Sequence, residues 1–327
     1  MRRRDFITLL GGAAVAAPVG ARAQQAGIPV IGFLNTGSLD SYRTQVKTFH
    51  QALKETGYVE GQNVAIEYRW AENQIDRLSL LADDLVRRKV SVIAAGDSPA
   101  SALAAKSATT TIPIVFINAA DPVGIGLVAS FNRPGGNVTG ATLLSAELVA
   151  KRLGILRDLL PSVKKIAMLT NPTRPGVDTQ KAQVREAAQA IGWSLHILEA
   201  SSERDFDEAF RAVLREQDGA LVVAPDALFL DRRATIADLA TRYTIPTMYE
   251  LREYVEAGGL VSYGASAAEL YRHGGTLTGQ ILMGRKPADL PVLQPTKFEL
   301  TINMKTAKAL GLTISPGLLS IADELIE

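Results

Sequence analysis

Short apolar runs alternate with amphipathic helical stretches along most of the chain, and this alternation constrains the fold more than any other feature. The run VIGFL at residues 30–34 precedes residues 41–56, where Val46, Phe49 and Leu53 recur at helical spacing. Further apolar runs, at residues 64–68, 90–95 and 114–117, alternate with helical stretches at residues 76–88 and 99–108. Apolar strands separated by helices are typical of a parallel sheet covered on both faces. We therefore predict an α/β fold.

The same order of strand and helix recurs further along the chain. The run KIAML at residues 165–169 leads, through a polar loop and a helical stretch, to Gly192. Placing Ile31 on Ile166 also places Gly57 on Gly192, and an aromatic residue follows each glycine. A series of matches in the same order indicates an internal repeat. We predict two Rossmann-like lobes with parallel sheets, built on one plan.

Two segments dense in turn-forming residues, 133–140 and 258–264, mark the places where the lobes end. The helical stretch 267–283 and the segment 291–312 still follow, so the simplest arrangement has the chain crossing between the lobes several times. We predict a multi-crossing hinge between two lobes. A tandem of independent domains is the alternative. The predicted lobes comprise residues 28–140 with 264–288, and residues 141–263 with 289–327.

The first residues have the layout of an export signal. Arginines at residues 2–4 precede an apolar run at residues 6–19, which is shorter than the roughly 20 residues that span a bilayer. A small-residue cleavage site follows at residues 21–23. We expect residues 1–23 to be a cleaved signal peptide of the twin-arginine type; the general secretion route and an amphipathic first helix are the alternatives. The chain has no cysteine to carry a lipid, so we expect a soluble, unlipidated periplasmic protein.

Composition and motifs argue against several classes of function. Basic and acidic residues number 35 and 34, so the chain lacks the basic surplus of a nucleic-acid-binding protein. His50, His196 and His273 are far apart, without the spacing of a metal site. We found no nucleophile elbow and no phosphate-binding glycine loop. We expect no cofactor, no metal and no catalysis; an exported enzyme that uses paired carboxylates, or a ligand-sensing subunit, is the alternative.

Polar residues follow the predicted strands, at the sheet edge where open α/β proteins bind ligands. Ser98 precedes Pro99 and can cap a helix whose free N–H groups suit a carboxylate. Acidic side chains can bind an ammonium group, an arginine can bind a carboxylate, and tyrosines can pack on an apolar ligand body. Each of these residues is also an ordinary candidate for a helix cap or a solvated loop. The candidate ligand-binding residues are Asn35, Thr36, Ser38, Tyr42, Asp97, Ser98, Asn118, Asp121, Asn171, Arg174, Asp226, Tyr249 and Glu250.

Several longer motifs resemble one family. They include IPIVFINAADPVGIGLVASFNRPGGNVTG, AMLTNP, APDALF, GGLVSYG and LPVLQPTKFELTINMKTAKALGL. These are similar to exported substrate-binding proteins of ABC transporters, in the branch whose members bind aromatic amino acids. The resemblance runs from about residue 28 to the C-terminus and implies a type I periplasmic-binding-protein fold that closes on a ligand. It also implies an ABC permease and ATPase as partners of a monomeric binding protein. Its ligand-facing positions here are residues 35–38, Ser98, Asn118, Asp121, Asn171 and Asp226.

One position departs from the resemblance. Relatives commonly carry Gly-Gly-Thr-Pro where this chain has Gly96-Asp97-Ser98-Pro99. A carboxylate at position 97 adds negative charge where the carboxylate of an amino acid is expected. The other candidate residues predict an amino acid or a related carboxylate as the ligand. The carboxylate at position 97 leaves a cation or a neutral solute as alternatives.

Overall fold

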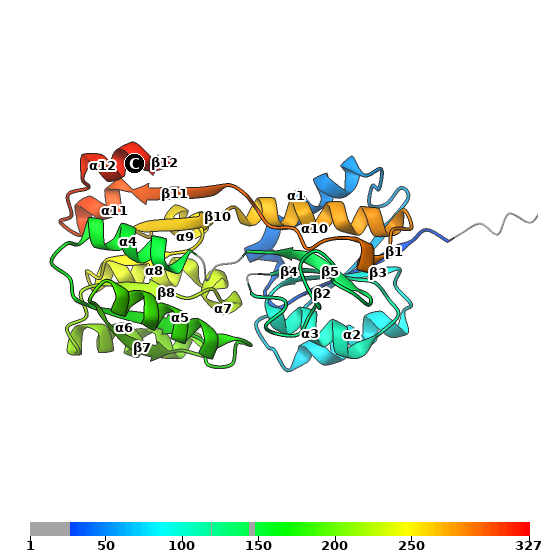
Figure 1. Ribbon diagram of the computed structural model, residues 1–327, viewed down its shortest axis with the longest axis horizontal. Coiled ribbons are helices and arrows are strands. Elements are labelled where there is room, and N and C mark those ends of the chain that lie inside the picture. The colour runs from blue at the N-terminus through cyan, green and yellow to red at the C-terminus, as the bar shows by residue number, and fades with distance from the viewer. Residues whose placement is uncertain (1–26, 119, 144–147) are drawn as a thin grey trace, which may run out of the picture.

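A computed structural model describes residues 27–118, 120–143 and 148–327. The described chain forms two α/β halves side by side, each built on a sheet flanked by helices (Figure 1). The predicted α/β class with two sheets is therefore confirmed. The export signal predicted at residues 1–23 lies outside the described residues. Within them, no helix combines the length and the apolar character needed to cross a membrane.

The first half contains a five-stranded sheet in the order β2-β1-β3-β4-β5, and all its strands are parallel. Its strands are β1 (Val30–Asn35), β2 (Ala65–Trp70), β3 (Val92–Asp97), β4 (Ile114–Asn118) and β5 (Val138–Thr142). The helices between them are α1 (Leu39–Glu55), α2 (Arg77–Arg87) and α3 (Pro99–Ala108). Successive residues of a strand point to opposite faces, so Phe33 packs in the core with α1 and Leu34 in the core with α2 and α3.

The second half contains a seven-stranded sheet in the order β12-β11-β10-β9-β8-β6-β7. Its strands are β6 (Lys165–Thr170), β7 (Ser194–Glu199), β8 (Leu221–Val223), β9 (Thr247–Tyr249), β10 (Val261–Ala265), β11 (Phe298–Asn303) and β12 (Glu324–Ile326). Its helices are α4 (Val149–Leu159), α5 (Val177–Ala190), α6 (Phe206–Arg215), α7 (Ala227–Asp231), α8 (Arg233–Arg242), α9 (Arg252–Glu256), α11 (Met304–Ala309) and α12 (Pro316–Ile321). Strands β11 and β12 are the exceptions to the parallel pattern. Strand β11 runs antiparallel to β10, because the chain enters it from the first half, and β12 pairs parallel with β11.

The predicted repeat is visible in the topology. Strand β1 lies between β2 and β3, and β6 lies between β7 and β8 in the same way. Gly57 after α1 and Gly192 after α5 both have the positive φ that glycine adopts most easily at a helix end. The two halves therefore share one plan of winding.

The chain passes between the halves more than once. Helix α10 (Ala267–Leu282) follows β10 of the second sheet but packs on α1, β4 and β5 of the first half (Figure 1). The segment after α10 lies along β5, where the Leu293 amide donates to the Gly140 carbonyl at 2.9 Å. The chain then returns to the second sheet as β11. Each half therefore contains residues from distant parts of the sequence.

Candidate functional site

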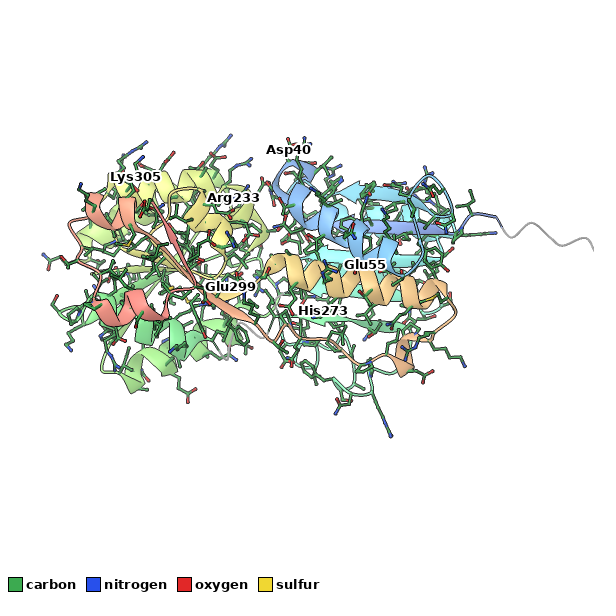
Figure 2. The ribbon with its side chains drawn as sticks, turned by 90° about the horizontal axis from the view of Figure 1, so that it is seen from above. Asp40, Glu55, Arg233, His273, Glu299 and Lys305 are labelled. Carbon is green, nitrogen blue, oxygen red and sulfur yellow. The ribbon has the colours of Figure 1, made fainter. Side chains whose placement is uncertain are left out.

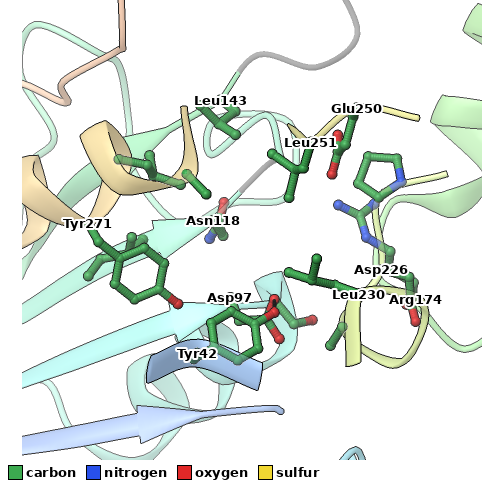
Figure 3. A pocket seen from close by; sticks show the side chains of 16 residues that line it. Tyr42, Asp97, Asn118, Leu143, Arg174, Asp226, Leu230, Glu250, Leu251 and Tyr271 are labelled. Carbon is green, nitrogen blue, oxygen red and sulfur yellow. Dashed lines mark hydrogen bonds between the residues drawn. The ribbon is translucent and has the colours of Figure 1, made fainter. Parts of the chain in front are cut away.

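A cavity lies between the halves, at the carboxyl ends of the strands of both sheets (Figure 3). The space between its walls is about 530 Å³ when the open solvent at its mouth is included. Its wall contains seven of the residues predicted from the sequence: Tyr42, Asp97, Ser98, Asn118, Arg174, Asp226 and Glu250. The topology thus brings polar residues from both predicted lobes to one place.

Asp97 ends β3 and has an unusual backbone. Its φ is +75°, in the left-handed region that non-glycine residues rarely adopt. The Tyr42 hydroxyl of α1 donates a hydrogen bond to its Oδ1, whereas its buried Oδ2 has no hydrogen-bond partner among the described residues. Burial raises the pKa of Asp97 to about 7, and the nearby Asp226 carboxylate adds to this effect, while the Tyr42 bond opposes it. The group is therefore close to half-charged near neutral pH.

Two neutral polar residues of the first half lie beside Asp97. The Ser98 hydroxyl accepts from the Ala100 amide at 3.2 Å and caps α3, as the Ser-Pro pair predicts. Asn118 ends β4, and its Oδ1 accepts from the Ala120 amide at 3.2 Å. Its buried Nδ2 has no hydrogen-bond partner within the described part of the chain. Asn118 can therefore donate to an anionic or carbonyl oxygen of a ligand.

The second half contributes charged groups of both signs. Asp226 caps α7 through the Leu228 amide at 2.9 Å and accepts from the Asn171 amide group at 3.3 Å. Glu250 follows β9, and its Oε2 lies 3.8 Å from an Arg152 guanidinium nitrogen. Burial raises the pKa of both carboxyls and lowers the pKa of Arg174, which lies in the turn after β6. These groups can bind the ammonium and carboxylate groups of a zwitterion.

The other six predicted residues do not line the cavity. Asn35 is buried and donates to the Tyr271 hydroxyl at 3.2 Å. Asp121 is exposed and accepts from the Val123 amide at 3.0 Å. Tyr249 is buried in the core, and its ring stacks on that of Tyr254 with 4.7 Å between the ring centroids. The remaining three are Thr36, which is buried, Ser38, which bonds to Asp231, and Asn171, which supports Asp226.

The sequence did not predict the apolar part of the wall. Tyr271 comes from the first turns of α10, and its ring centroid lies 6.2 Å from that of Tyr42. Glycine at position 96 permits this approach, because a Cβ there would lie 2.9 Å from the Tyr271 hydroxyl oxygen. Other cavity residues that sequence reasoning missed are Ile117, Leu143, Pro225, Ala227, Leu230, Leu251, Ala267 and Leu270. The helical spacing of Ala267, Leu270 and Tyr271 could have predicted that these three residues share one face of α10.

The halves also contact each other beside the cavity. Asp231, at the end of α7, accepts hydrogen bonds from Ser38 and Ser41 at the start of α1 and from Asn73, all in the first half. The Ser38 bond is 2.8 Å and the Asn73 bond is 2.9 Å. In Figure 2, Asp40 of α1 and Arg233 of α8 both lie near the boundary between the halves. We refer to these bonds as the Asp231 contact.

The described residues form no group of three or more His, Asp or Glu side chains that could hold a metal ion. The cavity instead combines apolar side chains, two tyrosines and charges of both signs. Such a mixture suits a small organic solute with polar ends.

Two α/β halves with a cavity between them are the architecture of type I periplasmic binding proteins. The chain belongs to the family described as ABC transporter substrate binding protein, which it matches over residues 28–326. The resemblance noted in the sequence is therefore confirmed.

Three relatives illustrate the similarity. A Clostridioides difficile (strain R20291) protein named tyrosine-binding protein is 30% identical over 267 residues, which cover 81% of this chain and 76% of that protein. An ABC domain from Streptococcus pneumonia, solved with L-Trp, has a TM-score of 0.83 and 25% identity, covering 91% of this chain and 99% of its own. The ligand-free, open structure of a Clostridium difficile substrate binding protein has a TM-score of 0.65 and 24% identity, with the same coverage of both chains.

Proposed function

We propose that the protein captures an amino acid in the cavity and delivers it to the permease and ATPase of an ABC importer. The observation that carries this proposal is the placement of Arg174, Asp226 and Glu250 at one side of an otherwise largely apolar cavity (Figure 3). A guanidinium binds a carboxylate through a planar pair of donors, and carboxylates bind an ammonium group. An α-amino acid presents both groups on adjacent atoms.

The relatives support an amino acid as the ligand class. One is named for tyrosine, and another was solved with L-Trp. In this chain, the cavity wall includes the aromatic rings of Tyr42 and Tyr271 and the aliphatic side chains of Leu143, Leu230 and Leu251, which suit the body of such a ligand. Asn118 and Ser98 add hydrogen-bonding groups on the first half.

The proposal includes closure of two lobes, divided near residues 140, 264 and 288. Cavity residues come from both halves, so a ligand that contacts both stabilises the closed arrangement. The structure agrees more closely with the L-Trp complex than with the ligand-free, open structure, which supports a closed arrangement here. The permease would then receive the closed form.

We propose the periplasm as the site of action, with residues 1–23 removed during export. The support is the order of arginines, apolar run and small-residue site at residues 2–23, together with the family. The twin-arginine route is the proposed route. A monomer suffices, because one chain supplies both walls of the cavity.

Calorimetric titration with the set of L-amino acids tests the function. We expect at least one to bind at micromolar concentration, and Asp226→Asn to weaken that binding by at least tenfold. Asparagine caps helices as well as aspartate does, so this change removes the charge and retains the α7 cap. Asp178→Asn, at an exposed residue of α5, is the matched control and should leave affinity unchanged. Absence of binding by any amino acid at millimolar concentration contradicts the proposal.

A further inference from the structure

The cavity holds more negative charge than an ordinary amino acid requires. Its wall contains the carboxyl groups of Asp97, Asp226 and Glu250, against the guanidinium of Arg174. Arg152 lies behind Glu250 at 3.8 Å and also donates to the Tyr263 carbonyl at 2.7 Å. With all five groups charged, three negative charges face two positive ones. A zwitterion has no net charge, so it leaves this surplus uncompensated.

The position of Asp97 identifies it as the source of the surplus negative charge. Asp226 and Glu250 share the second half with Arg174 and Arg152, whereas Asp97 lies across the cavity among Tyr42, Tyr271 and Asn118 (Figure 3). The Tyr42 hydroxyl binds one carboxyl oxygen, and the other oxygen is buried without a hydrogen-bond partner in the described chain. A buried carboxylate oxygen that lacks a partner costs free energy until a donor or a cation reaches it.

The backbone at Asp97 is costly as well. A φ of +75° suits glycine better than any residue with a side chain, and such strain tends to persist at functional sites. Helix α3 needs no carboxylate at this position, because Ser98 and Pro99 already form its first turn. A strained, partly unsatisfied carboxylate at the cavity wall therefore indicates a role in ligand binding.

We propose that Asp97 makes the site selective for amino acids with a cationic side chain, whose net charge is +1. This inference rests on the proposed function and names its ligand class. The second half binds the α-ammonium and α-carboxylate groups, and the aliphatic stem lies along Leu143, Leu230 and Leu251. The side-chain cation reaches Asp97 beside the rings of Tyr42 and Tyr271, where cation–π attraction adds to the ion pair.

L-Arginine and L-citrulline test the proposal, because they are nearly the same in shape and differ in side-chain charge. Calorimetry on the mature protein at pH 8 should show arginine binding at least tenfold more tightly than citrulline. In Asp97→Asn the two affinities should come within about threefold of each other, since asparagine tolerates the left-handed backbone but carries no charge. Asp83→Asn, at an exposed residue of α2, is the control and should keep the wild-type ratio.

The outcomes are distinguishable. Equal or tighter binding of citrulline by the wild type, or an arginine preference that persists in Asp97→Asn, overturns the proposal. Tight binding of a neutral amino acid such as L-tyrosine in preference to L-arginine also overturns it, while leaving the proposed function intact. Absence of binding by every amino acid overturns both.

Discussion

Asp97 illustrates how one residue can link stability to pH. Burial raises the pKa of its carboxyl group from 3.8 to about 7, so the folded protein holds this proton over a range in which the unfolded chain has released it. The groups that face it are Tyr42 of α1, Tyr271 of α10, Arg174, Asp226 and Asp231. Stabilisation by the protonated form is therefore present below pH 4 and is lost as the pH rises toward 7.

We predict that Asp97 contributes up to about 4 kcal/mol to the free energy of unfolding at pH 4 and that this contribution is lost as the pH rises to 7. Asp97→Asn should flatten the profile by that amount, because asparagine does not titrate. Urea unfolding at several pH values measures both profiles. Identical slopes in the two proteins contradict the assignment of this titration to Asp97.

Two glycines provide a second prediction at the residue scale. A Cβ at Gly96 would lie 2.9 Å from both Asn35 Nδ2 and the Tyr271 hydroxyl oxygen, whereas a Cβ at Gly154 within α4 meets nothing within 4 Å. Gly96→Ala should destabilise the fold by about 1–3 kcal/mol through overpacking and should weaken ligand binding by displacing Tyr271.

Gly154→Ala is the matched control and should stabilise the protein by about 0.5–1 kcal/mol, because alanine has the higher helix propensity. Thermal unfolding of the two variants compares them directly. Unchanged thermal stability in Gly96→Ala would contradict the prediction, because it would show that the Asn35 and Tyr271 side chains move aside without a cost in free energy.

At the scale of elements, helix α1 meets α7 across the cleft. The N-terminus of α1 carries partial positive charge and free N–H groups, and Ser38, although in the N-cap position, makes no capping hydrogen bond with its own helix. Its hydroxyl donates to Asp231 instead. A carboxylate from the second half therefore stabilises a helix start in the first half, but only while the halves are together.

Asp231→Asn should weaken ligand binding by about tenfold, since the closed form loses about 1.4 kcal/mol of contact energy. Ser38→Ala should have a smaller effect in the same direction, and the double variant should cost less than the sum, because both changes break one bond. Asp238→Asn, at an exposed residue of α8, is the control. Strictly additive effects on affinity contradict a direct Ser38–Asp231 coupling.

Local sequence patterns predicted the helices and strands well, but they did not predict which of these elements pack against each other. The helix predicted at residues 99–108 has those bounds in α3, and Ser98 caps it, because cap chemistry and periodicity act over a few residues. Seven cavity residues followed from the rule that ligands bind at the ends of parallel strands. Tyr271 and Asp231 did not follow, because their roles depend on which half α10 covers and on how α7 faces α1.

At the scale of the whole molecule, ligand binding should change the shape. Residues of both halves line one cavity, so a solute that contacts both halves shifts the population toward the closed form. Small-angle scattering should show a smaller radius of gyration with saturating ligand than without it. Asp231→Asn should have a larger radius than the wild type in the absence of ligand. Equal radii in all these states contradict closure.

The position of α10 has a consequence for synthesis. Helix α10 covers α1 and strands β4 and β5, and its Gly275 lies against the Phe49 carbonyl. In the chain, however, α10 comes after β6 to β10 of the second half. As the ribosome adds about 5–20 residues per second, the first sheet emerges well before its covering helix. The first half therefore completes its core only after most of the second half has been translated, and a fragment ending at residue 143 would leave that core exposed.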